Sequence, residues 1–154
     1  MIFLQVVKFS GLLLVILYLK MIEEKKIIVL FDGVCNLCNG LVNFIIKRDR
    51  KAIIKFAPLQ SNIAGEILQN HQFNNQELNS VIVLINDKIY TKSTAAILLI
   101  KELGGVWKAF YLLIYIPKFI RDFVYTLISK SRYKIFGKKN SCMIPTSETA
   151  SRFL

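Results

Sequence analysis

Two cysteines separated by two residues are the part of this sequence best suited to chemistry. Cys35 and Cys38 form a C-x-x-C motif in a chain of 154 residues whose third cysteine, Cys142, lies near the C-terminal end. Three cysteines are too few for a disulfide scaffold, and an odd number cannot all pair within one chain. The motif therefore indicates either redox chemistry or half of a metal site.

A buried strand and a helix are predicted on either side of the motif. Residues 27–31 form a short apolar and β-branched run, as a strand buried on both faces should, and a turn signal follows at residues 32–33. Residues 36–48 carry apolar side chains at helical spacing, so the motif opens a helix. The amides and dipole at a helix N-terminus favour the thiolate, which is the nucleophile in disulfide exchange. We therefore predict that Cys35 attacks and that Cys38, more shielded in the first turn, resolves the mixed disulfide.

Asp32 is the next candidate for chemistry. It stands three residues before Cys35, at the carboxyl end of the predicted strand. A carboxylate there is suited to accept and donate protons during disulfide exchange. The alternative is that its side-chain oxygens cap the following turn or helix, and the two roles are compatible.

Further elements extend this pattern to a complete small domain. A strand at 53–56, a helix over 61–70 with Ser61 as N-cap, strands at 81–85 and 88–91 around a two-residue turn, and a helix from its N-cap Ser93 to about residue 103 follow in order. The order β-α-β-α-β-β-α gives one four-stranded mixed sheet with helices on both faces. Residues 26–154 are thus predicted to be a single α/β domain with the minimal thioredoxin-like core.

An extension of C-terminal amphipathic helices is predicted from about residue 106. Residues 106–131 are rich in aromatic side chains and broken at Pro117, and charged residues interrupt the apolar stretch, which favours two helices packed on the domain over a membrane span. Residues 118–139 contain seven Lys and Arg against Asp122 alone, a net +6 of the chain's +11. We interpret this region as a solvated helix face, with peripheral contact to anionic lipid as the alternative. It contains no nucleic-acid-binding motif.

Residues 1–20 form an apolar leader before the predicted domain. The densest apolar run covers only residues 11–19, which is short for a spanning helix, and no small-residue cleavage site precedes Met21. Three interpretations stay open: a membrane anchor weakened by Lys8, a surface-lying helix, or sequence upstream of a true start at Met21. Without a convincing export signal we expect a cytoplasmic protein, with membrane association through residues 1–20 as the alternative.

The segment around the motif resembles a known family. Residues 31–40, Phe-Asp-Gly-Val-Cys-Asn-Leu-Cys-Asn-Gly, are similar to the signature of the DCC family of predicted thiol-disulfide oxidoreductases, named for its Asp, Cys and Cys. The similarity continues through residues 56–61, 103–105, Pro117, 121–125, 132–133, 136–137 and Cys142. The resemblance implies a thioredoxin-like fold with Asp32, Cys35 and Cys38 as the functional set. It also implies protein-disulfide reductase activity with an unidentified substrate and electron donor, and no cofactor or metal is expected.

One departure from thioredoxins lies before the third strand. Thioredoxins proper carry a cis-proline there, which faces the C-x-x-C motif and helps to pair with an extended protein substrate, whereas residues 78–81 contain no proline. Ser80 is the residue that we expect to face the thiols instead. The sequence therefore leaves the substrate class open.

Further hypotheses concern Cys142. Its polar, turn-like surroundings at residues 138–145 suit either an ordinary side chain or, if the tail folds back, an extra resolving or regulatory thiol for Cys35. Cys142 would also complete a structural zinc site with Cys35, Cys38 and His71. The second half of such a site lacks paired-ligand spacing, and His71 is more simply a solvent-facing loop residue. A membrane-peripheral binding protein without redox activity is the remaining alternative.

Overall fold

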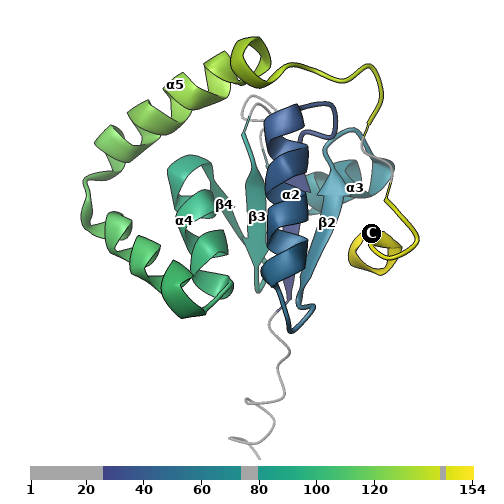
Figure 1. Ribbon diagram of the computed structural model, residues 1–154, viewed down its shortest axis with the longest axis horizontal. Helices are drawn as coiled ribbons and strands as arrows, with labels where there is room; N and C mark the ends of the chain where they lie inside the picture. The colour runs from purple at the N-terminus through teal and green to yellow at the C-terminus, as the bar shows by residue number, and fades with distance from the viewer. Residues whose placement is uncertain (1–25, 74–79, 143–144) are drawn as a thin grey trace, which may run out of the picture.

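The order of strands and helices predicted from the sequence is confirmed by the computed structural model (Figure 1), which describes residues 26–73, 80–142 and 145–154. The core comprises β1 (Ile27–Phe31), α2 (Asn36–Arg48), β2 (Ile54–Pro58), α3 (Asn62–Asn70), β3 (Ile82–Ile85), β4 (Lys88–Thr91) and α4 (Lys92–Glu102). After it come η2 (Gly105–Tyr115), α5 (Lys118–Phe136) and η3 (Ala150–Arg152). The leader at residues 1–20 lies outside the described residues.

A four-stranded mixed sheet in the order β2-β1-β3-β4 forms the centre of the fold. β1 and β2 are parallel and are joined by the crossover helix α2, whereas β3 is antiparallel to both β1 and β4. The β3–β4 hairpin turns at Asn86 and Asp87, which have φ values of 48° and 62°. Asn and Asp tolerate this left-handed conformation, which type I′ hairpins require at both turn positions. The predicted sheet is confirmed, and the fold is thioredoxin-like.

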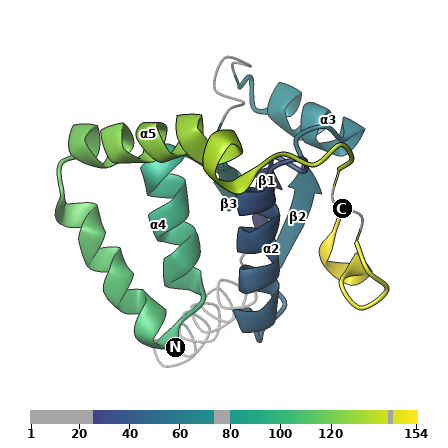
Figure 2. The same cartoon turned by 45° about the horizontal axis from the view of Figure 1, so that its top comes forward.

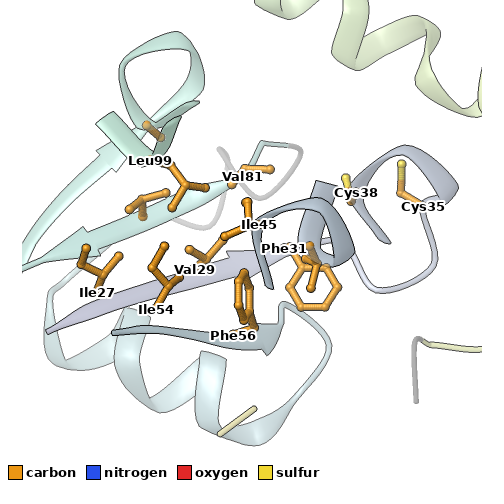
Figure 3. Packing of buried hydrophobic residues seen from close by; sticks show 13 residues of the cluster. Ile27, Val29, Phe31, Cys35, Cys38, Ile45, Ile54, Phe56, Val81 and Leu99 are labelled. Carbon is orange, nitrogen blue, oxygen red and sulfur yellow. The ribbon is translucent and has the colours of Figure 1, made fainter. Parts of the chain in front are cut away.

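The buried strand β1 separates two layers of the core. Ile27, Val29 and Phe31 pack with residues of α2 and α4 on one face of the sheet (Figure 3). Ile28 and Leu30 pack with residues of α3 on the other face. Successive side chains of a strand point to opposite faces, so a continuously apolar strand must be covered on both sides. The first face is the one that carries Cys35 and Cys38.

Of the two N-cap residues predicted from the sequence, one is found at the start of its helix and the other is not. Ser61 is the N-cap of α3, and its hydroxyl accepts a hydrogen bond of 3.2 Å from the Ala64 amide. Ser93 was wrongly predicted as the N-cap of α4, because the helix already begins at Lys92 after Thr91. Ser93 is instead buried in the first turn, where its hydroxyl donates a hydrogen bond to Asp122 of α5. The Ser93 side chain therefore makes a contact between two helices and does not cap its own helix.

The predicted C-terminal extension consists of η2 and α5, and the break between them falls at Pro117 as expected. η2 packs along α4, and α5 then crosses from α4 to the first turn of α2 (Figure 2). Within residues 26–73, 80–142 and 145–154, no helix has the length and apolarity needed to cross a bilayer.

Candidate functional site

The cysteine pair lies where β1 passes into α2. Cys35 occupies the N-cap of α2 with extended backbone, and its carbonyl accepts the first helical hydrogen bond, 3.0 Å from the Asn39 amide. Cys38 follows in the first turn, and both sulfurs are free thiols at the same end of the core (Figure 3). The two thiols are close enough for Cys35 to influence the pKa of Cys38. The predicted placement of the motif at a helix N-terminus is confirmed.

Burial and the neighbouring thiol keep a proton on Cys38. Burial is the largest cause that raises the pKa of the Cys38 thiol to about 12, and the neighbouring Cys35 thiol is the second. The nearby Arg132 guanidinium acts in the opposite direction and lowers this pKa. At neutral pH Cys38 is therefore a thiol and not a thiolate.

Both cysteines are buried, Cys35 at 0% and Cys38 at 4% exposed, so the prediction that Cys38 is the more shielded of the two stays a prediction. Cys35 is covered by residues 137–142, which we call the strap. The strap pairs with Cys35 in an antiparallel bridge at Lys138, and the Lys139 amide donates a 2.8 Å hydrogen bond to the Val34 carbonyl. Sequence reasoning missed this cover because it comes from the far end of the chain.

Asp32 is the centre of a buried polar cluster next to the motif. Its carboxylate accepts hydrogen bonds from the Arg132 guanidinium at 2.9 Å, from the Tyr133 hydroxyl, and from the Gln60 amide at 3.0 Å. The Val34 amide donates a further bond of 3.2 Å to the same carboxylate, which is the turn-capping role predicted for Asp32. Its role in proton transfer stays a prediction.

Arg132, Tyr133 and Gln60 are site residues to which the sequence analysis gave no role. Arg132 and Tyr133 come from the last two turns of α5, and Gln60 follows β2. All three lie in segments that resemble the DCC family, but nothing local shows which side chain they contact. The available signal was physical, since a carboxylate buried beside two thiols needs a cation, and a buried charge is tolerated only when paired.

Cys142 lies on the turn that precedes the motif. A Cβ atom added to Gly33 would come within 2.1 Å of the Cys142 sulfur, so only a glycine leaves room for this contact. The Gln60 side-chain oxygen accepts hydrogen bonds from the Gly33 amide at 3.2 Å and from the Cys142 thiol at 3.6 Å. The tail does fold back, but the redox role of Cys142 stays a prediction.

A cavity of about 160 Å³ lies beside Cys38 between α2, α4 and α5. It is lined mainly by apolar side chains, namely Leu37, Leu41, Val81, Ala96, Leu99, Ile100 and Ile128. Arg132 and Tyr125 contribute polar groups, and the Tyr125 hydroxyl accepts a 3.0 Å hydrogen bond from the Val81 amide. Ser80 is buried directly before Val81, and its proposed contact with the thiols stays a prediction.

The arrangement gives no support to the zinc hypothesis. His71 follows α3, on the sheet face opposite the cysteines, and lies in a hollow with residues of β4. Its Nδ1 atom is 2.8 Å from the Ile67 carbonyl oxygen. In the part of the chain that the structure describes, no three His, Cys, Asp or Glu side chains gather as metal ligands.

A β-α-β-α-β-β-α fold whose first helix opens with two neighbouring thiols defines the class of thioredoxin-like dithiol proteins. Within that class, residues 29–138 match the model of the DCC1-like thiol-disulfide oxidoreductase family. The chain belongs to this family.

Two similar proteins bear on the identity of the chain. It is 47% identical over 127 residues to "Uncharacterized protein YuxK" of Bacillus subtilis (strain 168), an alignment that covers 82% of this chain and 93% of the relative. It is 40% identical over 122 residues to "DCC family protein At1g52590, chloroplastic" of Arabidopsis thaliana, covering 78% of this chain and 70% of the relative. No solved structure matches the chain significantly.

Proposed function

We propose that this chain is a disulfide reductase in which Cys35 is the attacking thiolate and Cys38 is the resolving thiol. The observation that carries the proposal is the position of the pair. Cys35 is the N-cap of α2, and Cys38 lies in the first turn, where burial and the neighbouring Cys35 raise its pKa to about 12. A sulfur at the N-cap receives the helix dipole, which stabilises a negative charge.

The proposed reaction has two exchange steps. In the first, the Cys35 thiolate attacks one sulfur of a substrate disulfide, forms a mixed disulfide and releases the other substrate sulfur as a thiolate. In the second, Cys38 loses its proton and attacks the Cys35 sulfur, which releases the second substrate thiolate and leaves a Cys35–Cys38 disulfide. Two electrons pass from the chain to the substrate, and a dithiol reductant must restore the pair.

The buried charges next to the pair are suited to the second step. Cys38 must become a thiolate in order to resolve the mixed disulfide, although its surroundings oppose this. Arg132 lines the same cavity as Cys38 and lowers the pKa of its thiol. We infer that Arg132 stabilises the developing Cys38 thiolate and that Asp32, held by Arg132 at 2.9 Å, accepts the proton.

Access to Cys35 determines which substrates fit the proposal. The strap covers Cys35 with extended backbone and makes an antiparallel bridge to it through Lys138. An extended segment of a protein that carries a disulfide would take the place of this backbone and make the same kind of hydrogen bonds. This supports protein disulfides as the substrate class, even though the sequence lacks a proline in the loop before β3.

Trapping of the mixed disulfide tests the proposed roles. Reduced Cys38→Ser protein should form a stable 1:1 mixed disulfide with glutathione disulfide, because the proposed resolving thiol is absent, whereas reduced Cys35→Ser protein should form little. The wild type should reduce insulin disulfides in the presence of dithiothreitol. The adducts are measured by intact mass spectrometry after acid quenching.

Cys142→Ser is the matched control because it removes the third thiol and leaves the pair intact. It should behave as the wild type in the insulin assay. Preferential trapping at Cys38 in the Cys35→Ser protein would reverse the assigned roles. Complete lack of insulin reduction by the wild type would contradict the reductase proposal itself.

A further inference from the structure

Helix α5 turns several of its polar side chains toward the domain. Asp122 accepts a hydrogen bond from Ser93, and the Tyr125 hydroxyl accepts one from the Val81 amide. One and two turns further on, Ser129 and Arg132 face the cavity beside Cys38. In most globular proteins the solvent-facing side of a helix is polar. In α5 the side that faces away from the domain instead carries large apolar residues.

The outward positions of α5 form an apolar stripe. Large apolar side chains stand in pairs spaced four residues apart, which places them on one side of a helix. They are Phe119, Ile120, Phe123, Val124 and Leu127, and each is between 44% and 74% exposed. Figure 1 shows α5 at the outer margin of the molecule.

η2, the segment before α5, also exposes large apolar side chains. Its inner side is anchored, because Trp107 packs edge-on against Phe44 of α2 with ring centroids 4.9 Å apart. Val106, Leu112 and Tyr115 are among its exposed side chains, and Val106 and Tyr115 are about 80% exposed. We define the outward face as the exposed apolar side chains of residues 105–127. A soluble protein rarely leaves so many neighbouring large apolar side chains in water unless they bind something.

The charges next to the outward face are of one sign. Six exposed lysines accompany it, namely Lys108, Lys118, Lys130, Lys134, Lys138 and Lys139. Asp122 is the only acidic residue between positions 105 and 139, and it faces Ser93 of α4. A second copy of the chain seated on the same face would bring like charges together, because an isologous interface pairs a surface with itself. The charge pattern instead fits an apolar partner with a negative surface.

We propose that the outward face docks on the surface of a bilayer that contains anionic lipid. The apolar and aromatic side chains enter the boundary between headgroups and acyl chains, and the lysines contact the lipid phosphates. The polar inner side of α5 stays bound to the domain, so docking needs no rearrangement of the redox site. This surface is independent of the proposed reductase activity.

Sedimentation with vesicles tests the docking surface in the full chain. The protein should bind vesicles of phosphatidylcholine and phosphatidylglycerol, bind phosphatidylcholine alone at least tenfold more weakly, and lose affinity as salt is added. Phe119→Glu/Phe123→Glu should weaken binding at least tenfold, because it places two charges in the apolar stripe. Ile63→Glu is the matched control, since Ile63 is 40% exposed on α3, away from the outward face.

Circular dichroism and thermal unfolding should confirm that both variants fold, as expected for exposed positions. Vesicle binding by the double variant equal to that of the wild type would overturn the proposal and place the contact elsewhere, for example in residues 1–20. Absence of vesicle binding by the wild type would overturn it as well. So would a dimer in analytical ultracentrifugation that Phe119→Glu/Phe123→Glu dissociates, because a second copy would then be the occupant.

Discussion

Replacement of Arg132 by methionine should destabilise the reduced protein mainly through Asp32. The Arg132–Asp32 side chains are only 6% and 7% exposed, so removal of the cation leaves a carboxylate charge buried without compensation. Breaking a buried ion pair in this way costs about 3–5 kcal/mol. Gln60, Tyr133 and the Val34 amide still donate hydrogen bonds to Asp32, so we expect the low end of that range, about 3 kcal/mol at pH 7.

The loss should depend on the carboxylate. Arg132→Met/Asp32→Asn should recover a large part of the stability lost in Arg132→Met, because the second substitution removes the uncompensated charge. Urea unfolding of the reduced proteins, followed by far-ultraviolet circular dichroism, measures these free energies.

The second buried ion pair provides a matched control. Arg152 pairs with Asp49, also in the interior, at the end of α2 opposite the cysteines. Arg152→Met should lose comparable stability but leave the reactivity of Cys38 unchanged. Arg132→Met should in addition slow alkylation of Cys38, because Arg132 lowers the pKa of that thiol. A loss below about 1 kcal/mol at pH 7, with no recovery in Arg132→Met/Asp32→Asn, would refute the assigned charge balance.

Two further predictions concern the thiols. The pKa of Cys38 is raised from 9.0 to about 12 in the folded, reduced protein, so the native state keeps its proton while the unfolded chain loses it above pH 9. The free energy of unfolding must therefore fall as the pH rises above 9. Between pH 9 and 10 the wild type should lose about 1 kcal/mol more than Cys38→Ser, as measured by urea unfolding. Equal losses in the two proteins would contradict the raised pKa. Gly33→Ala should displace Cys142, because the new Cβ would lie 2.1 Å from its sulfur, and iodoacetamide should then label Cys142 severalfold faster. An unchanged labelling rate would show that the tail does not rest on Gly33.

Sequence reasoning located the motif and its supporting elements because these depend on local pattern. The apolar run of β1 and the helical spacing of α2 suffice to place Cys35 at a helix N-terminus. Asn86 and Asp87 likewise identify the hairpin from their own conformational preferences. These features need no information from distant parts of the chain.

The contacts that complete the site could not be predicted in the same way. Helix α5 was expected from its sequence, but both its polar and its apolar residues recur at helical spacing. The contacts with Asp32 and Ser93 determine which side faces the domain. Asp32 lies 100 residues before Arg132 in the chain. Hydrophobicity alone would place the wrong side of α5 inward, because burial of the polar side depends on paired charges and hydrogen bonds.

The burial of Cys35 also affects how its thiol is oxidised. A thiolate open to water is converted by peroxide to a sulfenic acid and then, irreversibly, to sulfinic and sulfonic acids. Cys35 is fully buried beside the strap and has Cys38 as a neighbour. A sulfenic acid formed on Cys35 would therefore meet Cys38 readily and condense to the disulfide. The fold thus favours reversible oxidation of Cys35 over the irreversible steps.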